Sequence, residues 1–123
     1  MIKLVYCVRR KQDLPQEEFH RYWYEVHGPL VRKYAQALRI RRYVQVHTLN
    51  SPINQALGQQ RGCQVEPYDG LAELWWDSMD DFLSAAQTPE GREAARALAE
   101  DEARFIDHAR STLFLAEDKE IIG

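Results

Sequence analysis

The first segment of the chain, IKLVYCVR at residues 2–9, is rich in β-forming residues and carries apolar side chains on both faces. One face holds Ile2, Leu4, Tyr6 and Val8. Val5 and Cys7 point the other way. A strand that is apolar on both sides requires a packed layer against each side. The fold must therefore cover both faces of the sheet that contains this strand.

Three further segments alternate in the same manner, and helical patterns lie between them. The other predicted strands are residues 40–49, 70–77 and 111–121. The predicted helices are residues 13–38, 79–86 and 88–104, the last two opened by the capping residues Ser78 and Thr88. This order predicts one α+β domain over residues 1–123, a ferredoxin-like β-α-β-β-α-β protomer with a four-stranded antiparallel sheet and its helices on one face.

The sheet face opposite those helices has nothing in the chain to cover it. Since its side chains are largely apolar, the simplest cover is the same face of a second copy. We therefore expect a homodimer through sheet-to-sheet packing, a dimeric α+β barrel.

The first predicted helix contains an aromatic stretch, FHRYWYEVHGPL, at residues 19–30. Its apolar stripe is Phe19, Tyr22, Trp23, Val26 and Leu30. On an ideal helix, His20 and His27 lie together on a flank of this stripe. Pro29 lacks a backbone donor and disfavours helical geometry at Gly28, so a kink or a restart is expected there.

Composition excludes several classes of function. The 123 residues include 16 Lys and Arg against 19 Asp and Glu, a net charge of -3, which argues against nucleic-acid and polybasic membrane binding. No apolar run approaches the roughly 20 residues that a membrane helix needs. The beginning of the chain does not resemble a secretory signal, and two cysteines are too few for a disulfide framework. We expect a reduced, cytoplasmic protein.

Cofactor signatures are also missing. The four histidines are scattered without a metal-ligand spacing, and there is no glycine-rich phosphate loop. We expect no cofactor, although haem needs only a single histidine and spacing does not exclude it. The long connection from Asn50 to Pro67 is rich in amides, Gly and Pro, as lids, arms and contact loops often are. A short helix is possible at residues 53–57, and the sequence leaves the role of the connection open.

Five segments of the chain, in this order, carry a resemblance to a known family: KLVYCVRRK, LPQEEFHRYWYEVHGPLV, RYVQVH, YDGLAELWWDS and DEARFIDHARS. In these strings the chain resembles EthD-domain proteins of the dimeric α+β barrel superfamily, most distinctively in F-x-x-Y-W-x-x-x-H-G-P-L. The resemblance implies a ferredoxin-like protomer and a dimer. The family is associated with bacterial ether degradation. Similar domains in polyketide pathways look like decarboxylases, dehydratases or cyclases, and superfamily relatives include cofactor-independent monooxygenases, lactone isomerases and haem enzymes.

Four residues are candidates for catalysis: His27, His47, Tyr43 and Glu73. His27 precedes Gly28 at the expected helix break, where free carbonyls favour an imidazolium. The alternative is that His27 caps the kink by bonding a carbonyl. Tyr43, His47 and Glu73 alternate along strands as ordinary cross-strand partners do. If they converge with His27 on one cleft, these groups suffice for proton transfer near neutral pH.

Four aromatic residues are candidates for substrate binding: Phe19, Trp23, Trp75 and Phe105. Each fits a core position equally well, and an aromatic ring can line a pocket with one edge while it packs with the other. The sequence thus predicts an enzyme that acts on an apolar or aromatic oxygenated small molecule by cofactor-independent acid-base chemistry, of the isomerase, dehydratase or decarboxylase type. The alternatives are a cofactor-independent monooxygenase or a non-catalytic accessory binder of a hydrophobic intermediate.

Overall fold

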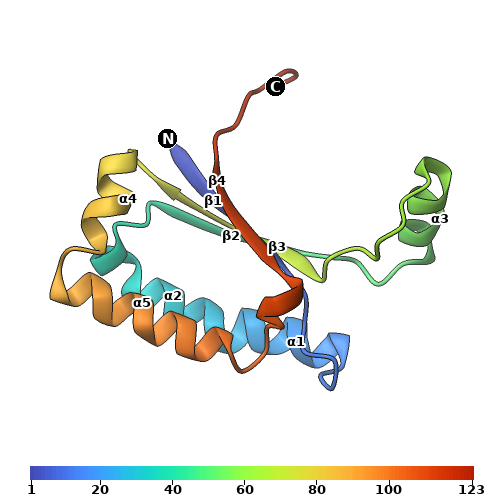
Figure 1. Cartoon of the computed structure of the whole chain (residues 1–123), viewed down its shortest axis with the longest axis horizontal. Coiled ribbons are helices and arrows are strands. Elements are labelled where there is room, and N and C mark those ends of the chain that lie inside the picture. The colour runs from blue at the N-terminus through green and yellow to red at the C-terminus, as the bar shows by residue number, and fades with distance from the viewer.

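The computed structural model describes residues 1–123 as a four-stranded antiparallel sheet with its main helices on one face (Figure 1). The strands, in the spatial order β2-β3-β1-β4, are β1 (Ile2–Val8), β2 (Arg42–His47), β3 (Gly70–Trp76) and β4 (Thr112–Ala116). The helices are α1 (Gln16–Tyr22), α2 (Gly28–Leu38), α3 (Pro52–Arg61), α4 (Met79–Ala85) and α5 (Pro89–Glu102), with a π-helical segment η1 (Trp23–His27) and a 3-10 turn η2 (His108–Arg110). The expected ferredoxin-like order is confirmed, and α3 is an addition between β2 and β3.

The capping signals place the helix starts. The Ser78 hydroxyl accepts a hydrogen bond from the Asp81 amide at 3.1 Å, and the Thr88 hydroxyl accepts one from the Gly91 amide at 2.9 Å. Each bond satisfies an amide that would otherwise lack a partner in the first helical turn. Helix α3 is longer than the predicted residues 53–57: it begins after the Ser51 cap and continues to Arg61, before Gly62 adopts a left-handed conformation.

The helix break takes the form of a π turn. Segments α1, η1 and α2 run on without leaving right-handed helical geometry, and the Gly28 amide donates to the Trp23 carbonyl, five residues back. Such a turn holds an extra residue, so it rotates the following residues around the axis relative to an ideal helix. The helix therefore does not end at His27 but continues into α2.

This rotation corrects two expectations from the sequence. Val26, placed in the apolar stripe, is 43% exposed, whereas His27, placed on a flank, is 4% exposed. The buried stripe actually runs through Phe19, Trp23, His27 and Val31, one residue every four. The π turn therefore brings an imidazole into the core.

The antiparallel register fixes which strand residues share a face. Tyr43 pairs with Leu74, which in turn pairs with Leu4, and all three face the helices. The opposite face carries Val5, Cys7, Val44, Val46, Leu71, Phe114 and, among them, Lys3, Glu73 and Trp75. The core between sheet and helices centres on Trp23, Phe19, Phe105 and Val8, the largest fully buried side chains.

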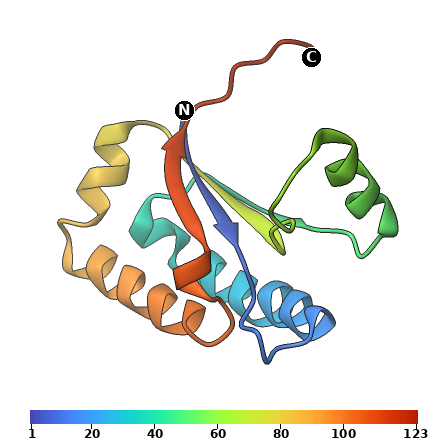
Figure 2. The same ribbon diagram turned by 45° about the vertical axis from the view of Figure 1, so that its right-hand side comes forward.

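Helix α3 stands away from both layers as an arm beyond the ends of β2 and β3, which both views show (Figure 1, Figure 2). None of its residues is buried, and Ile53 and Leu57 are 65% and 54% exposed. The helix-free face of the sheet also lies open in these views. None of the helices combines the length and the apolar character needed to cross a membrane.

Candidate active site

A cavity of about 220 Å³ lies between the helices and the sheet. Strands β1, β2, β3 and β4 form its floor, and helices α2, α4 and α5 contribute to its walls. Almost all of its lining is apolar. Four side chains with titratable groups reach it: Tyr6, His27, Tyr43 and Glu102. An apolar pocket with a few converging polar groups is the usual form of a small-molecule site.

His27 is held by a buried carboxylate. Its Nδ1 lies 2.8 Å from Oδ2 of Asp101 on α5, and the two residues are 4% and 6% exposed. The other carboxylate oxygen accepts a hydrogen bond from the Tyr22 hydroxyl at 2.6 Å. Because a carboxylate only accepts hydrogen bonds, Nδ1 of His27 carries a proton and donates it to Asp101. No protein group forms a hydrogen bond with Nε2, which makes it a candidate general base.

Glu102, the next residue on α5, supplies a carboxyl group to the cavity. Burial raises its pKa, and the positive charge available on His27 and His108 opposes the rise only in part. Nε2 of His108 lies 3.6 Å from Oε1 of Glu102. The pKa of the nearby Tyr6 is raised as well, first by burial and then by the Glu102 charge. A carboxyl group with a raised pKa keeps its proton closer to neutral pH and suits a proton donor.

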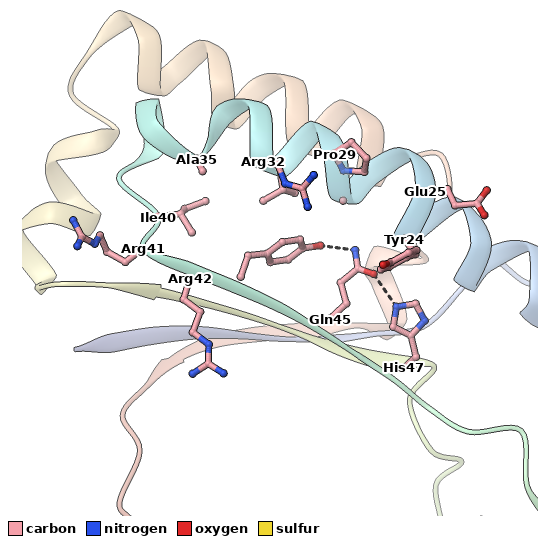
Figure 3. Close-up of a pocket in the computed structure, with 13 residues that line it drawn as sticks. Tyr24, Glu25, Pro29, Arg32, Ala35, Ile40, Arg41, Arg42, Gln45 and His47 are labelled. Carbon is pink, nitrogen blue, oxygen red and sulfur yellow. Dashed lines mark hydrogen bonds between the residues drawn. The ribbon is translucent and has the colours of Figure 1, made fainter.

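A side-chain network orients the Tyr43 hydroxyl. The amide nitrogen of Gln45 donates to the Trp23 carbonyl and to the Tyr43 oxygen, both at 2.8 Å. The Gln45 oxygen lies 2.7 Å from Nε2 of His47 (Figure 3). Because the Trp23 carbonyl can only accept, the orientation of the amide is fixed, and the Tyr43 oxygen accepts from Gln45 while its own proton has no partner within the chain. Burial raises the pKa of Tyr43 to about 12, so the phenol stays protonated at neutral pH.

An open groove of about 630 Å³, called here the outer groove, runs between α2 and the edge strand β2 (Figure 3). Its lining shares Val31, Ile40 and Tyr43 with the cavity. These three side chains therefore lie between the outer groove and the cavity.

His20 and His47 form a second imidazole pair, outside the cavity. Their ring centroids lie 4.7 Å apart, and the pKa of each is lowered, chiefly by burial. The nitrogens of His20 have no hydrogen-bond partner. His47 lines the outer groove, and its link to the cavity residue Tyr43 is a chain of two hydrogen bonds through Gln45.

The remaining predicted residues divide between the cavity and the core. His27, Tyr43 and Trp23 line the cavity together. Phe105 lies behind it, its ring centroid 5.1 Å from that of His27, and Phe19 is fully buried against Phe105 and Trp23. These two phenylalanines support the wall and do not form its surface.

Glu73 and Trp75 lie on the helix-free face, which corrects their expected place in one cleft with Tyr43. The reason is the register, which pairs Val44 with Glu73 and so puts Tyr43 on the other face. There the Glu73 carboxylate accepts from Lys3 Nζ at 2.7 Å, and the Arg42 guanidinium lies 4.6 Å from the Trp75 ring centroid.

Sequence reasoning missed Asp101, Glu102, Tyr6 and Gln45. A signal for Asp101 exists: Ala94, Leu98 and Phe105 form the apolar stripe near the end of α5, and Asp101 occupies a position within that stripe. An acid in a core position needs a buried partner, and a buried histidine is a suitable one. No comparable sequence pattern marks Gln45. No cluster of three or more His, Cys, Asp or Glu side chains is arranged to hold a metal ion.

The fold and this cavity define a small α+β protein of the ferredoxin-like class with a few polar groups in an apolar pocket. The family model of the EthD domain matches residues 11–109, and the chain belongs to the EthD family.

Solved structures agree with this assignment. An EthD family protein from Bacillus halodurans superposes with a TM-score of 0.65 at 21% identity, over 97% of this chain and 99% of the other. SnoaB, a cofactor-independent oxygenase from Streptomyces nogalater, superposes with a TM-score of 0.56 at 13% identity, over 98% of this chain and 95% of the other. A dimeric ferredoxin-like protein of unknown function from Thermobifida fusca superposes with a TM-score of 0.56 at 16% identity, over 94% of this chain and 88% of the other. At these identities the likeness concerns the fold.

Proposed function

We propose that this EthD-family chain, as a single domain over residues 1–123, is an enzyme that acts on an apolar or aromatic oxygenated small molecule. The chemistry is cofactor-independent proton transfer of the isomerase, dehydratase or decarboxylase type. One observation carries the proposal: the buried His27–Asp101 pair, 2.8 Å apart, lies in the wall of an apolar cavity.

The residues of the cavity have complementary roles. Nε2 of His27 removes a proton from a carbon next to a substrate carbonyl, and Asp101 stabilises the imidazolium that forms. The Tyr43 hydroxyl donates to the oxygen on which negative charge develops. Glu102, whose pKa is raised by burial, returns a proton to the product. The apolar walls exclude water, which strengthens each of these interactions.

Deuterium exchange tests this proposal without knowledge of the natural substrate. The probe is 2-tetralone, a flat bicyclic ketone with acidic hydrogens next to its carbonyl, and mass spectrometry follows its deuteration in D2O. We expect the wild-type protein to accelerate exchange above the buffer rate, and His27→Gln to lose roughly a hundredfold or more of that acceleration. Lys33→Gln, on the exposed side of α2, is the control and keeps the wild-type rate.

The same experiment separates the proposal from its rivals. Binding of 2-tetralone with exchange no faster than in buffer would support an accessory binder of a hydrophobic intermediate. Exchange that persists unchanged in His27→Gln would remove His27 from the mechanism.

A cofactor-independent monooxygenase is the second candidate, favoured by the likeness to SnoaB. In that case the substrate, once deprotonated by His27, would itself supply electrons to O2. Anthrone is a suitable probe because it can be oxidised to anthraquinone with the release of water. Oxygen uptake on addition of anthrone, absent in His27→Gln, would support this candidate over the first.

We further propose that the chain works as a homodimer through the helix-free sheet face, in the cytoplasm. Apolar side chains on that face support the dimer, since Val46 and Phe114 are 39% and 49% exposed. The Thermobifida fusca relative in fold is described as dimeric. Two free cysteines, Cys7 and Cys63, fit a reducing compartment.

A further inference from the structure

The outer groove is positively charged although the chain as a whole is acidic. The net charge is -3, yet the charged residues along the groove are Arg32, Arg41, Arg42 and a single acid, Glu25. Glu25 already has a partner, since its carboxylate lies 3.6 Å from the guanidinium of Arg21. The groove therefore has no free negative charge of its own.

The three arginines are not equivalent. Arg41 lies 3.7 Å from the carboxylate of Asp77. Arg42 turns to the far side of β2, where its guanidinium covers the ring of Trp75 (Figure 3). Arg32 alone reaches from α2 into the groove, and it forms no ion pair and no hydrogen bond with any residue of the chain (Figure 3). A guanidinium with five donors and no partner is available to a ligand.

The groove and the cavity are neighbouring pockets of different polarity. The cavity is apolar, whereas the groove carries the free cation, and Val31, Ile40 and Tyr43 belong to both linings. A ligand that fills both must have an apolar body and an anionic end. The planar fork of a guanidinium matches a carboxylate with two parallel hydrogen bonds.

From this arrangement we infer that the substrate carries a carboxylate, and that Arg32 binds this group in the outer groove and thereby selects the substrate. The inference rests on the proposed function, because the same cavity holds the apolar body. Arg32 contributes to specificity and positions the ligand, while His27 performs the proton transfer.

A matched pair of probes tests the inference by binding alone. The probes are 2-naphthoate and its neutral counterpart 2-naphthamide, and isothermal titration calorimetry measures their Kd values. We expect wild-type protein to bind the carboxylate more tightly. Arg32→Gln should raise the Kd of 2-naphthoate roughly three- to tenfold and leave the Kd of 2-naphthamide unchanged. This is the effect expected from the loss of a charge-assisted hydrogen bond at an exposed position.

Two controls sharpen the result. Arg32→Lys keeps the charge without the fork and should fall between wild type and Arg32→Gln. Lys33→Gln removes a neighbouring charge, whose ammonium lies 5.3 Å from the Tyr34 ring centroid, and should change neither Kd. Raising the salt concentration should weaken the binding of 2-naphthoate more to wild-type protein than to Arg32→Gln.

The outcomes distinguish this inference from the proposed function. Equal affinity of wild type for the two probes, or an equal effect of Arg32→Gln on both, would overturn the carboxylate site and leave the cavity and His27 intact. Failure of both probes to bind would count against the cavity itself, and so against both proposals. Loss of exchange in His27→Gln, with the preference for 2-naphthoate retained, would confirm the two roles as separate.

Discussion

At the scale of single residues, Asp101 decides what His27 can do. Replacing it by Asn preserves the shape of the side chain but offers an N–H group or a weaker acceptor to Nδ1. The imidazole is then free to carry its proton on Nε2, where the base is needed. We expect Asp101→Asn to reduce the exchange rate of 2-tetralone by about a hundredfold or more, with little change in the affinity for the ketone.

The matched control is Tyr22→Phe, which removes only the 2.6 Å hydrogen bond to the other oxygen of the same carboxylate. It should lower the free energy of unfolding by about 1 kcal/mol and change the exchange rate far less. If both variants reduced the rate equally, Asp101 would be acting through the stability of the core and not through the tautomer of His27.

Glu102 gives a prediction about pH. Burial raises its pKa in the folded protein above the value in the unfolded chain, so the folded state binds the proton more tightly. Ionising it therefore costs stability, and this cost grows as the pH rises from the unfolded pKa, about 4.3, through the folded one. We expect Glu102→Gln to be more stable than wild type at neutral pH, with a gain that disappears in acid, while the exchange rate falls.

Urea denaturation at several pH values measures this difference, and Glu100→Gln, an exposed neighbour on α5, is the control. A Glu102→Gln protein that is less stable at neutral pH would mean that attraction to His27 and His108 outweighs burial. Glu102 would then stabilise the fold as well as serve the proposed mechanism, whereas residues needed for activity usually lower stability.

At the scale of elements, the segment around Gly28 shows what a sequence can and cannot predict. Pro29 correctly predicted an irregularity, because its missing donor interrupts any α-helix. A kink, a restart and a π turn all relieve that problem, and the choice depends on tertiary partners. Here the Gln45 side chain, distant in sequence, bonds the Trp23 carbonyl within the π turn. The burial of His27 and the exposure of Val26 follow from that choice.

Strand alternation correctly predicted the faces of the first strand, since Leu4, Tyr6 and Val8 line the cavity and Val5 and Cys7 lie on the opposite face. Alternation could not predict which residues of neighbouring strands lie on the same side of the sheet. That depends on register, and a shift of one residue would have joined Glu73 to Tyr43. The observed register separates them, so the polar partners of the cavity come from α5 in place of β3.

The link between β2 and the π turn yields a prediction of its own. Gln45→Leu removes the donor to the Trp23 carbonyl and to the Tyr43 oxygen. The Trp23 carbonyl keeps its bond from the Gly28 amide, whereas the Tyr43 oxygen loses its donor. We expect a loss of about 1–3 kcal/mol in the free energy of unfolding, measured by urea denaturation. The exchange rate should fall further than the stability loss explains, because the Tyr43 proton is no longer directed into the cavity.

Gln36→Leu, the same change at an exposed position of α2, serves as the reference and should be nearly neutral. An unchanged exchange rate in a folded Gln45→Leu protein would show that the orientation of Tyr43 has no role in the chemistry.

At the scale of the whole molecule, the two faces of the sheet differ, and this difference is the basis of the proposed homodimer. The helices and the cavity occupy one face, while the other presents Val44, Val46, Leu71 and Phe114 around the Lys3–Glu73 ion pair. Arm α3 and the exposed Ile121 and Ile122 of the C-terminal segment add further uncovered apolar surface. An apolar area of this kind on a monomer marks an interaction surface.

Disrupting that face should therefore separate the protomers. Light scattering on the wild-type chain should give twice its mass of 14.4 kDa at micromolar concentration. Phe114, opposite Val5 on the helix-free face, is 49% exposed, and Phe114→Lys should shift the mass toward the monomer because a two-fold interface would bring two such charges together. Leu83→Lys is the matched control, since Leu83 is 51% exposed but lies on α4 in the helical layer, and it should stay dimeric. A wild-type protein that remains at 14.4 kDa would rule out the sheet-to-sheet dimer, whereas dissociation by Leu83→Lys alone would move the interface to the helices.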